Sequence, residues 1–185
     1  MNLILASASP RRRELLQQIT PNFDVFPAAV DESPGPLQVP GLYALDTASA
    51  KAKFISDQNP EALVFGADTI VCLGTKIFGK PRDSIENYNM LMQFSNRQHV
   101  VGTAVVIARA GEILNREFVV TKVLFRKLSA KEVNEYSASG NGLDKAGGYG
   151  IQDKAGKFVE AIDGCYYNVV GLPLATTARL LEGYI

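Results

Sequence analysis

Apolar residues in the first half of the chain form short runs that alternate between strand-like and helix-like spacing. The run at 62–71 is apolar at nearly every position, which is typical of a strand buried on both faces. The predicted strands are residues 3–6, 23–26 and 62–71, with a hairpin at 73–78. The predicted helices are residues 13–19, 43–58 and 84–94. This alternation of strands and helices favours an α/β fold.

The second half of the chain favours longer strands. Residues 100–109 and 112–128 carry β-branched and aromatic residues at alternate positions, and Ala110-Gly111 between them has hairpin spacing. Further predicted elements are a helix at 131–136 capped by Ser129, strands at 158–162 and 167–170, and a terminal helix that opens at Leu172-Pro173. Because no linker divides the chain, we expect a single domain, residues 1–185, with two lobes around a cleft.

Composition excludes several classes of protein. The chain has 185 residues, of which 46% are hydrophobic and 21% charged, so we expect a packed core and no extensive disorder. The 19 Lys and Arg residues balance 19 Asp and Glu residues, which disfavours general nucleic-acid binding. The N-terminus lacks a signal-peptide pattern and no apolar run reaches membrane-spanning length, so we expect a cytoplasmic protein without a membrane partner. Cys72 and Cys165 lack metal-ligand spacing and are expected to be buried free thiols.

The first candidate site follows directly on the first predicted strand. Ser9 can cap the next helix and Pro10 suits its first position, so free N–H groups of that helix point beyond the strand. Arg11 and Arg12 add two guanidiniums, whose donors match phosphate oxygens. Together with Ser7, the segment predicts a polyphosphate site; an ordinary helix start is the alternative.

Two further candidate clusters carry charge. Asp68 interrupts an apolar strand, and a buried carboxylate is costly unless a metal, a cation or several donors compensate it. A site therefore explains Asp68 better than a core does, although the carboxylate could instead accept backbone N–H bonds. Lys80-Pro81-Arg82 places two cations at the start of a predicted helix, which suits an anion; a solvated pair of cations is the alternative.

A glycine-rich stretch at 144–152 ends in Gln152. A primary amide, an aromatic ring and exposed backbone occur together there, which is the set needed to recognise a planar base; a purely structural loop is the alternative. Glu32 and Lys51 are isolated charges that composition alone assigns to the surface. His99 is expected to be packed or half-exposed, and the reaction should not depend on it.

The order and spacing of five motifs resemble those of the Maf family of nucleoside triphosphate pyrophosphatases. The motifs are LASASPRR, GADTIV, KPR, DKAGGYGIQ and VVGLP, and they span nearly the whole chain. The resemblance implies an elongated, two-lobed α/β fold similar to that of the inosine triphosphate pyrophosphatases, with a mixed central β-sheet flanked by helices and a central cleft. It also implies hydrolysis of a nucleoside triphosphate to the monophosphate and pyrophosphate with a divalent metal cation, Mg²⁺ or Mn²⁺.

Three places in the chain look like the dTTP/UTP branch of that family. No Trp stands between Pro10 and the Arg pair, Ala67-Asp68-Thr69 replaces a Ser-Asp-Gln, and the loop at 144–147 differs from that of the 7-methyl-GTP branch. The expected partner is a small-molecule nucleoside triphosphate, and the resemblance also suggests a homodimer. A 7-methyl-GTP pyrophosphatase and a non-catalytic, nucleotide-binding regulator of septum formation are the alternatives.

The resemblance implies roles for individual residues. Asp68 matches the catalytic proton acceptor of the family. Positions that set base specificity match Arg11, Thr69 and Gln152. The remaining polar residues of the family's cleft match Ser7, Arg12, Glu32, Lys51 and Lys80. We therefore expect catalysis from Asp68, Lys80 and Lys51, substrate binding by Ser7, Arg11, Arg12, Thr69 and Gln152, and a metal held by Glu32 and Asp68.

Overall fold

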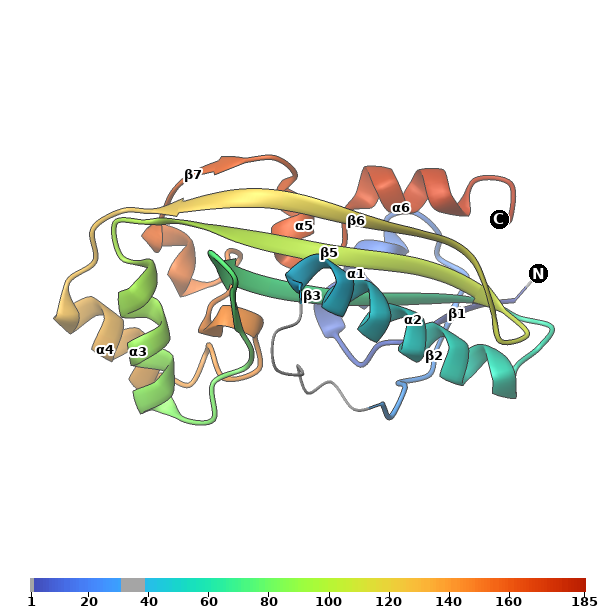
Figure 1. The fold of residues 1–185 in the computed structure, drawn as a ribbon, viewed down its shortest axis with the longest axis horizontal. Coiled ribbons are helices and arrows are strands. Elements are labelled where there is room, and N and C mark those ends of the chain that lie inside the picture. The colour runs from blue at the N-terminus through green and yellow to red at the C-terminus, as the bar shows by residue number, and fades with distance from the viewer. Residues whose placement is uncertain (1, 31–38) are drawn as a thin grey trace. The chain divides into compact units, whose positions relative to one another are not determined.

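The computed structural model of the chain describes residues 2–30 and 39–185. Its strands are β1 (Leu3–Leu5), β2 (Asp24–Val25), β3 (Leu63–Leu73), β4 (Lys76–Phe78), β5 (Gln98–Arg109), β6 (Glu112–Phe125) and β7 (Val159–Asp163) (Figure 1). Its α-helices are α1 (Pro10–Gln17), α2 (Pro40–Gln58), α3 (Ser84–Phe94), α4 (Ala130–Ala138), α5 (Tyr166–Val170) and α6 (Leu174–Leu181). Two short 3-10 helices are η1 (Ala146–Gly148) and η2 (Lys154–Phe158).

The strands form one mixed sheet in the order β2-β1-β3-β5-β6-β7, with β4 paired to β3. Strand β1 runs parallel to both β2 and β3, whereas β4 is antiparallel to β3 and β7 is antiparallel to β6. The turn between β5 and β6 has positive φ angles at Ala110 (48°) and Gly111 (78°), as a two-residue hairpin requires. The predicted α/β fold with a mixed central sheet is confirmed.

The structure contradicts one predicted strand, at 167–170, where the chain forms the short helix α5. Asn168 is fully buried there, and its side-chain amide donates to Val101 O at 3.0 Å and to Thr121 Oγ1 at 3.0 Å. These two bonds anchor the segment to β5 and β6 through a side chain and not through a backbone ladder. The short apolar pattern did not distinguish the two outcomes, because a run of this length fits either conformation.

The chain divides into two compact units that interleave along the sequence. Unit 1 comprises Met1–Thr69, Thr103–Val119 and Gly171–Ile185, and unit 2 comprises Ile70–Gly102 and Val120–Val170. Strands β3, β5 and β6 each contribute residues to both units. The expectation of a single domain whose lobes flank a cleft stays a prediction.

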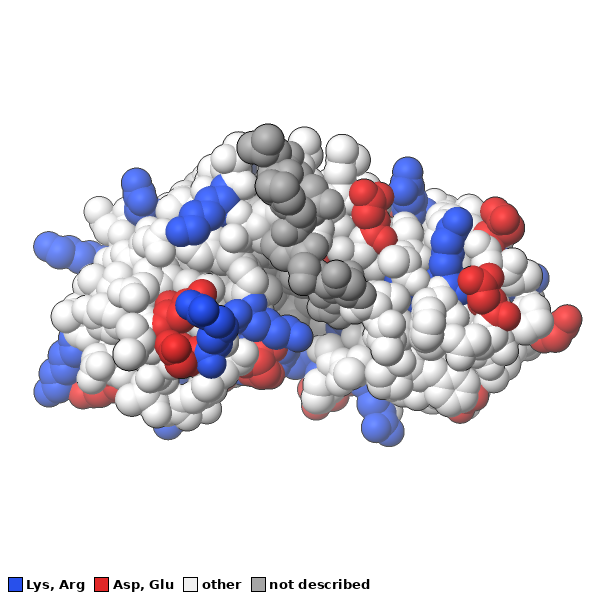
Figure 2. Space-filling model, turned by 60° about the horizontal axis from the view of Figure 1, so that its bottom comes forward, with Lys and Arg blue, Asp and Glu red and all other residues white. Residues whose placement is uncertain are grey.

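Charged side chains are interspersed on the face drawn in Figure 2, where basic and acidic residues alternate with uncharged surface. This mixture agrees with the equal numbers of basic and acidic residues, 19 each. In the part of the chain that the structure describes, every helix is too short or too polar to cross a membrane. Both cysteines are free thiols, as predicted, but the prediction that both are buried is wrong for Cys165, which is half-buried. Burial of Cys72 raises its pKa to about 11.

A cluster of aromatic rings forms the core of unit 2. Phe94 stacks on the imidazole of His99 with ring centroids 4.4 Å apart, and Phe125 and Tyr149 meet His99 edge-on. His99 Nε2 lies 2.7 Å from the hydroxyl of Tyr149, and His99 is only 1% exposed. Burial lowers the pKa of His99 from 6.5 to about 4, so the ring is neutral near neutral pH. The expectation of a packed histidine is confirmed.

The neutral, buried His99 predicts an acid-sensitive core. Between pH 6.5 and about 4, the unfolded chain binds a proton at this ring and the folded chain does not, so unfolding becomes easier as the pH falls. Urea unfolding from about pH 7 down to about pH 4.5 should show a loss of up to about 3 kcal/mol that is absent from His99→Gln. An equal loss in both proteins would contradict the assignment.

Candidate active site

The start of α1 follows the end of β1 after four residues. Ser9 is the N-cap of α1, and its hydroxyl accepts a bond from Arg12 N at 3.4 Å, while Pro10 occupies the first turn. The hydroxyl of Ser7 accepts a bond from Ser9 N at 3.3 Å. The predicted strand–cap–helix arrangement is therefore confirmed, and it sets both arginines of the motif on the first turn of α1.

The guanidinium of Arg12 joins three separate segments of unit 1. Nε donates to Gly171 O at 3.0 Å, Nη1 to Ser7 Oγ at 3.1 Å and Nη2 to Thr69 Oγ1 at 2.9 Å. The planar fork of donors that suits phosphate oxygens thus also holds the segments after β1, within β3 and before α6. Arg12 has an architectural role in addition to any contact with a ligand.

Thr69 extends this network to β5. Its hydroxyl lies 3.0 Å from the hydroxyl of Thr103, which is fully buried. Neither Thr103 nor the carbonyl of Gly171 was predicted from the sequence. A hydroxyl within the otherwise apolar run 100–108 of β5 was the available signal for Thr103, whereas a backbone acceptor such as Gly171 O has no side-chain signal at all.

Asp68 and Lys51 form a buried ion pair within unit 1. Lys51 Nζ from α2 lies 2.7 Å from Asp68 Oδ1 on β3, and the two side chains are 7% and 10% exposed. The surface position that composition alone assigned to Lys51 is wrong. Lys51 falls on the buried face of α2 with Ala44, Ala48 and Ile55, and this helical spacing was the signal for its burial. The cation compensates a carboxylate that would otherwise be costly to bury.

Close approach of α2 to β3 makes this pair possible. A Cβ at Gly66 would lie 2.6 Å from Ala48 O and 2.9 Å from the Cβ of Ala52, so only glycine fits at this crossing. Gly66 and Asp68 are two positions apart on β3 and therefore face the same side of the strand. The small side chains at the crossing bring the helix near enough for Lys51 to reach Asp68.

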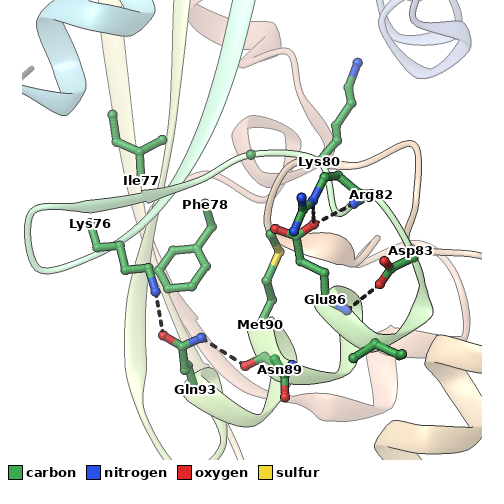
Figure 3. Close-up of a pocket in the computed structure, with 12 residues that line it drawn as sticks. Lys76, Ile77, Phe78, Lys80, Arg82, Asp83, Glu86, Asn89, Met90 and Gln93 are labelled. Atoms are coloured by element: carbon green, nitrogen blue, oxygen red, sulfur yellow. Dashed lines mark hydrogen bonds and ion pairs between the residues drawn. The ribbon is translucent and has the colours of Figure 1, made fainter. Parts of the chain in front are cut away.

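Lys80 and Arg82 lie in unit 2, around a hollow of about 620 Å³ (Figure 3). Arg82 is exposed and binds Glu86, with Nε 2.9 Å from Oε2, and its backbone N donates to the same oxygen at 2.8 Å. Asp83 caps α3, so the carboxylates of Asp83 and Glu86 already occupy the start of that helix. Figure 3 shows Lys80 extending away from this pair, and Lys80 is exposed. Of the two predicted cations, Lys80 is therefore the better candidate for an anionic ligand.

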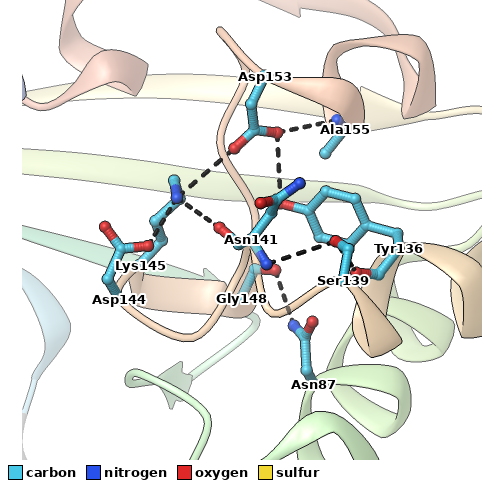
Figure 4. A network of polar contacts seen from close by, with 9 residues as sticks. All are labelled: Asn87, Tyr136, Ser139, Asn141, Asp144, Lys145, Gly148, Asp153 and Ala155. Atoms are coloured by element: carbon cyan, nitrogen blue, oxygen red, sulfur yellow. Dashed lines mark hydrogen bonds and ion pairs between the residues drawn. The ribbon is translucent and has the colours of Figure 1, made fainter.

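The aromatic ring of the glycine-rich stretch, that of Tyr149, lies in the core and not at the surface as base recognition would require. Tyr149 is buried in the core of unit 2 against His99 and Phe94, so its ring does not offer a face to a base. Gln152 is exposed, and its amide is accessible to a ligand. The neighbouring residues Lys145 and Asp153 form the polar network shown in Figure 4. Base recognition by stacking on Tyr149 is thus excluded, and recognition by the Gln152 amide stays a prediction.

The predicted site residues fall into separate groups. One group in unit 1 joins Ser7, Arg12 and Thr69, and the other pair in unit 1 is Lys51 with Asp68. Arg11 is half-buried on the first turn of α1. Lys80 and Gln152 belong to unit 2. Glu32 lies outside the described residues.

The side chains around Asp68 determine whether the expected divalent cation could bind there. Residues 2–30 and 39–185 contain no group of three His, Cys, Asp or Glu side chains arranged to hold a metal ion. Mg²⁺ commonly binds through one or two carboxylates and completes its ligand set with substrate phosphates and waters. The single carboxylate of Asp68 fits that pattern, with a nucleotide supplying further oxygens. Glu32, the second predicted ligand, cannot be placed.

Comparisons with known proteins agree with the motifs. A family model described as "Maf-like protein" matches residues 2–184. A dTTP/UTP pyrophosphatase of Clostridium botulinum is 45% identical over 94% of this chain and 92% of its own length. One from Myxococcus xanthus is 47% identical over 97% of this chain and 91% of its own length. The structure of a HAM1 protein from Coxiella burnetii has a similar fold, with a TM-score of 0.50 and 11% identity over 68% of this chain and 73% of that protein.

The crossing at Gly66 predicts that Gly66→Ala destabilises the protein. The new methyl group overlaps backbone and side-chain atoms of α2, so the helix must move away from β3. We expect the free energy of unfolding to fall by about 1–3 kcal/mol, measured by chemical denaturation. Gly79→Ala is the matched control, because no atom lies within 4 Å of a Cβ at Gly79. Equal stability of Gly66→Ala and the wild-type protein would show that the helix does not pack so closely.

Proposed function

Since the chain belongs to the family of Maf-like proteins, we propose that it is a nucleoside triphosphate pyrophosphatase that hydrolyses dTTP and UTP. The products are the nucleoside monophosphate and pyrophosphate. The observation that carries this proposal is the buried Asp68–Lys51 pair, a carboxylate that is held in place by a cation on the neighbouring helix α2. Relatives with the printed name dTTP/UTP pyrophosphatase, 45% and 47% identical to this chain, support the substrate class.

In this proposal Asp68 accepts the proton of the water that attacks the α-phosphorus. Its Oδ1 is bound by Lys51 at 2.7 Å, which fixes the orientation of the carboxylate. A base held in one orientation directs its free oxygen toward a single position, and such positioning is a large part of general-base catalysis. Lys51 also keeps a positive charge beside the reacting phosphate, where negative charge accumulates as the bond breaks.

Arg12, Lys80 and Ser7 contact the phosphates in the same proposal. Charge moves onto pyrophosphate as it leaves, and fixed cations stabilise that charge without reorganising. The bond from Arg12 Nε to Gly171 O leaves the orientation of the guanidinium largely determined before a ligand arrives. Lys80 is exposed and can follow the ligand.

A divalent cation, Mg²⁺ or Mn²⁺, would be held by Asp68 together with Glu32 and would neutralise part of the triphosphate charge. Without such compensation, the carboxylate of Asp68 would repel the phosphates. Gln152 would pair its amide donor and acceptor with the edge of a pyrimidine, and Arg11 and Thr69 would contribute to the choice of base. A cytoplasmic location and a homodimer stay predictions.

A nucleotide panel tests this function directly. With Mg²⁺ present, we expect the protein to release pyrophosphate from dTTP and UTP with a higher kcat/KM than from 7-methyl-GTP. Omission of the divalent cation should reduce the rate, because the phosphate charge is then uncompensated. A preference for 7-methyl-GTP would assign the chain to the other branch. Nucleotide binding without pyrophosphate release would instead indicate a regulatory protein.

Substitution of the proposed base gives a second test. Asp68→Asn should lower kcat for UTP by at least about 10²-fold, because the amide cannot accept the proton. The matched control is Asp46→Asn, which changes an exposed carboxylate on the same helix that carries Lys51. Circular dichroism and thermal unfolding should show that both variants are folded. Unaltered turnover by a folded Asp68→Asn protein would remove Asp68 from the role of base.

A further inference from the structure

Asn87 is a fully buried polar residue on the inner face of α3, beside the apolar core of unit 2. Its Nδ2 donates to Gly148 O at 2.7 Å. Its Oδ1 is buried and has no hydrogen-bond partner among the described residues. An orphan acceptor of this kind costs free energy, which an apolar side chain of similar size would avoid. The bond to Gly148 is therefore the feature that accounts for an amide at this position.

Two glycines of the neighbouring segment provide the space for this amide. A Cβ at Gly148 would overlap Asn87 Nδ2, and a Cβ at Gly142 would lie 2.9 Å from the same atom. Gly148 also has a φ angle of 74°, in the left-handed region that favours glycine. The backbone of the glycine-rich stretch thus leaves room for the side chain of Asn87. Figure 4 shows the bond from Asn87 to Gly148.

The same stretch is bonded to the turn that carries Lys80. Gly147 N donates to Gly79 O at 3.0 Å, directly before Lys80. A Cβ at Gly148 would lie 3.5 Å from Pro81 Cγ, so Pro81 packs against this backbone on the other side of Lys80. Asn87, Gly79 and Pro81 therefore contact the same two glycines, Gly147 and Gly148.

A second set of contacts carries this constraint on to Gln152. Asp153 N donates to Gly150 O at 3.2 Å, and Asp153 Oδ2 lies 3.6 Å from Lys145 Nζ. The hydroxyl of Tyr136 donates to Asp153 Oδ1 at 3.3 Å. Lys145 precedes the glycines and Asp153 directly follows Gln152. Their ion pair therefore joins the two ends of the segment 146–152 (Figure 4). Gln152 thus lies between the glycines and a residue, Asp153, that is bonded back to Gly150 and Lys145.

We propose that Asn87 is a positioning residue that sets Gln152 and Lys80 relative to each other through the backbone of Gly147 and Gly148. This inference rests on the proposed function, in which Lys80 contacts the phosphates and Gln152 the base. Asn87 acts through the two glycines and touches neither part of the nucleotide. Through the Asn87 amide, the position of Gln152, which contacts the base, depends on the position of the turn that carries Lys80.

The test uses Asn87→Leu, which has similar volume and cannot donate to Gly148 O. Loss of one buried bond should raise KM for UTP by about fivefold or more, with a smaller effect on kcat. The ratio of kcat/KM for UTP to kcat/KM for GTP should fall. In a Gln152→Ala background, Asn87→Leu should change KM for UTP by less than about twofold, because the group to be positioned is absent. Fully additive effects of the two substitutions would overturn the proposal.

A control and a substrate-free measurement separate positioning from general destabilisation. Val133→Ala removes volume from the same core, with no hydrogen bond to the stretch, and should lower stability while KM for UTP stays unchanged. Amide hydrogen exchange at 145–152 should be faster in Asn87→Leu than in Val133→Ala. Failure of the wild-type protein to release pyrophosphate would refute the proposed function. Normal wild-type turnover, with unchanged exchange and KM in Asn87→Leu, would refute the positioning role alone.

Discussion

The buried ion pair between Lys51 and Asp68 is the constraint on which the packing of α2 against β3 depends. Both charges are removed from water. Their attraction offsets the desolvation cost only because Lys51 Nζ lies as close as 2.7 Å to Asp68 Oδ1. That geometry requires α2 to approach β3 at Gly66, where no side chain fits. The fixed orientation of the Asp68 carboxylate thus depends on packing, because small residues at a helix–strand crossing bring Lys51 within reach.

Arg12 connects motifs that lie far apart in the sequence. One guanidinium binds Ser7 after β1, Thr69 within β3 and the carbonyl of Gly171 before α6. The late VVGLP motif, for which the sequence offered no chemical role, contributes a backbone acceptor to this arginine. A side chain that is pre-oriented in this way loses less conformational entropy when it meets a ligand.

Local signals in the sequence predicted much of the fold and part of the site. The caps Ser9 and Ser129 act through their own helices, so their positions could be predicted without tertiary information. Burial of the Tyr149 ring depends on contacts with residues distant in the sequence. Composition placed Lys51 wrongly, although its helical spacing with Ala48 and Ile55 was a local signal of burial. Asn87 had no signal in the sequence, because its partner is a backbone carbonyl 61 positions away.

Strand β3 carries two functional groups at adjacent positions that turn to opposite sides, a carboxylate toward Lys51 and a hydroxyl toward Arg12. A shift of the strand by a single residue would exchange these surroundings, because the side-chain period of a strand is two. Pairing of Leu3, Ile4 and Leu5 with Leu63, Val64 and Phe65 prevents that shift. The alignment of an apolar ladder thereby determines which chemical group each of the two cations, Lys51 and Arg12, contacts.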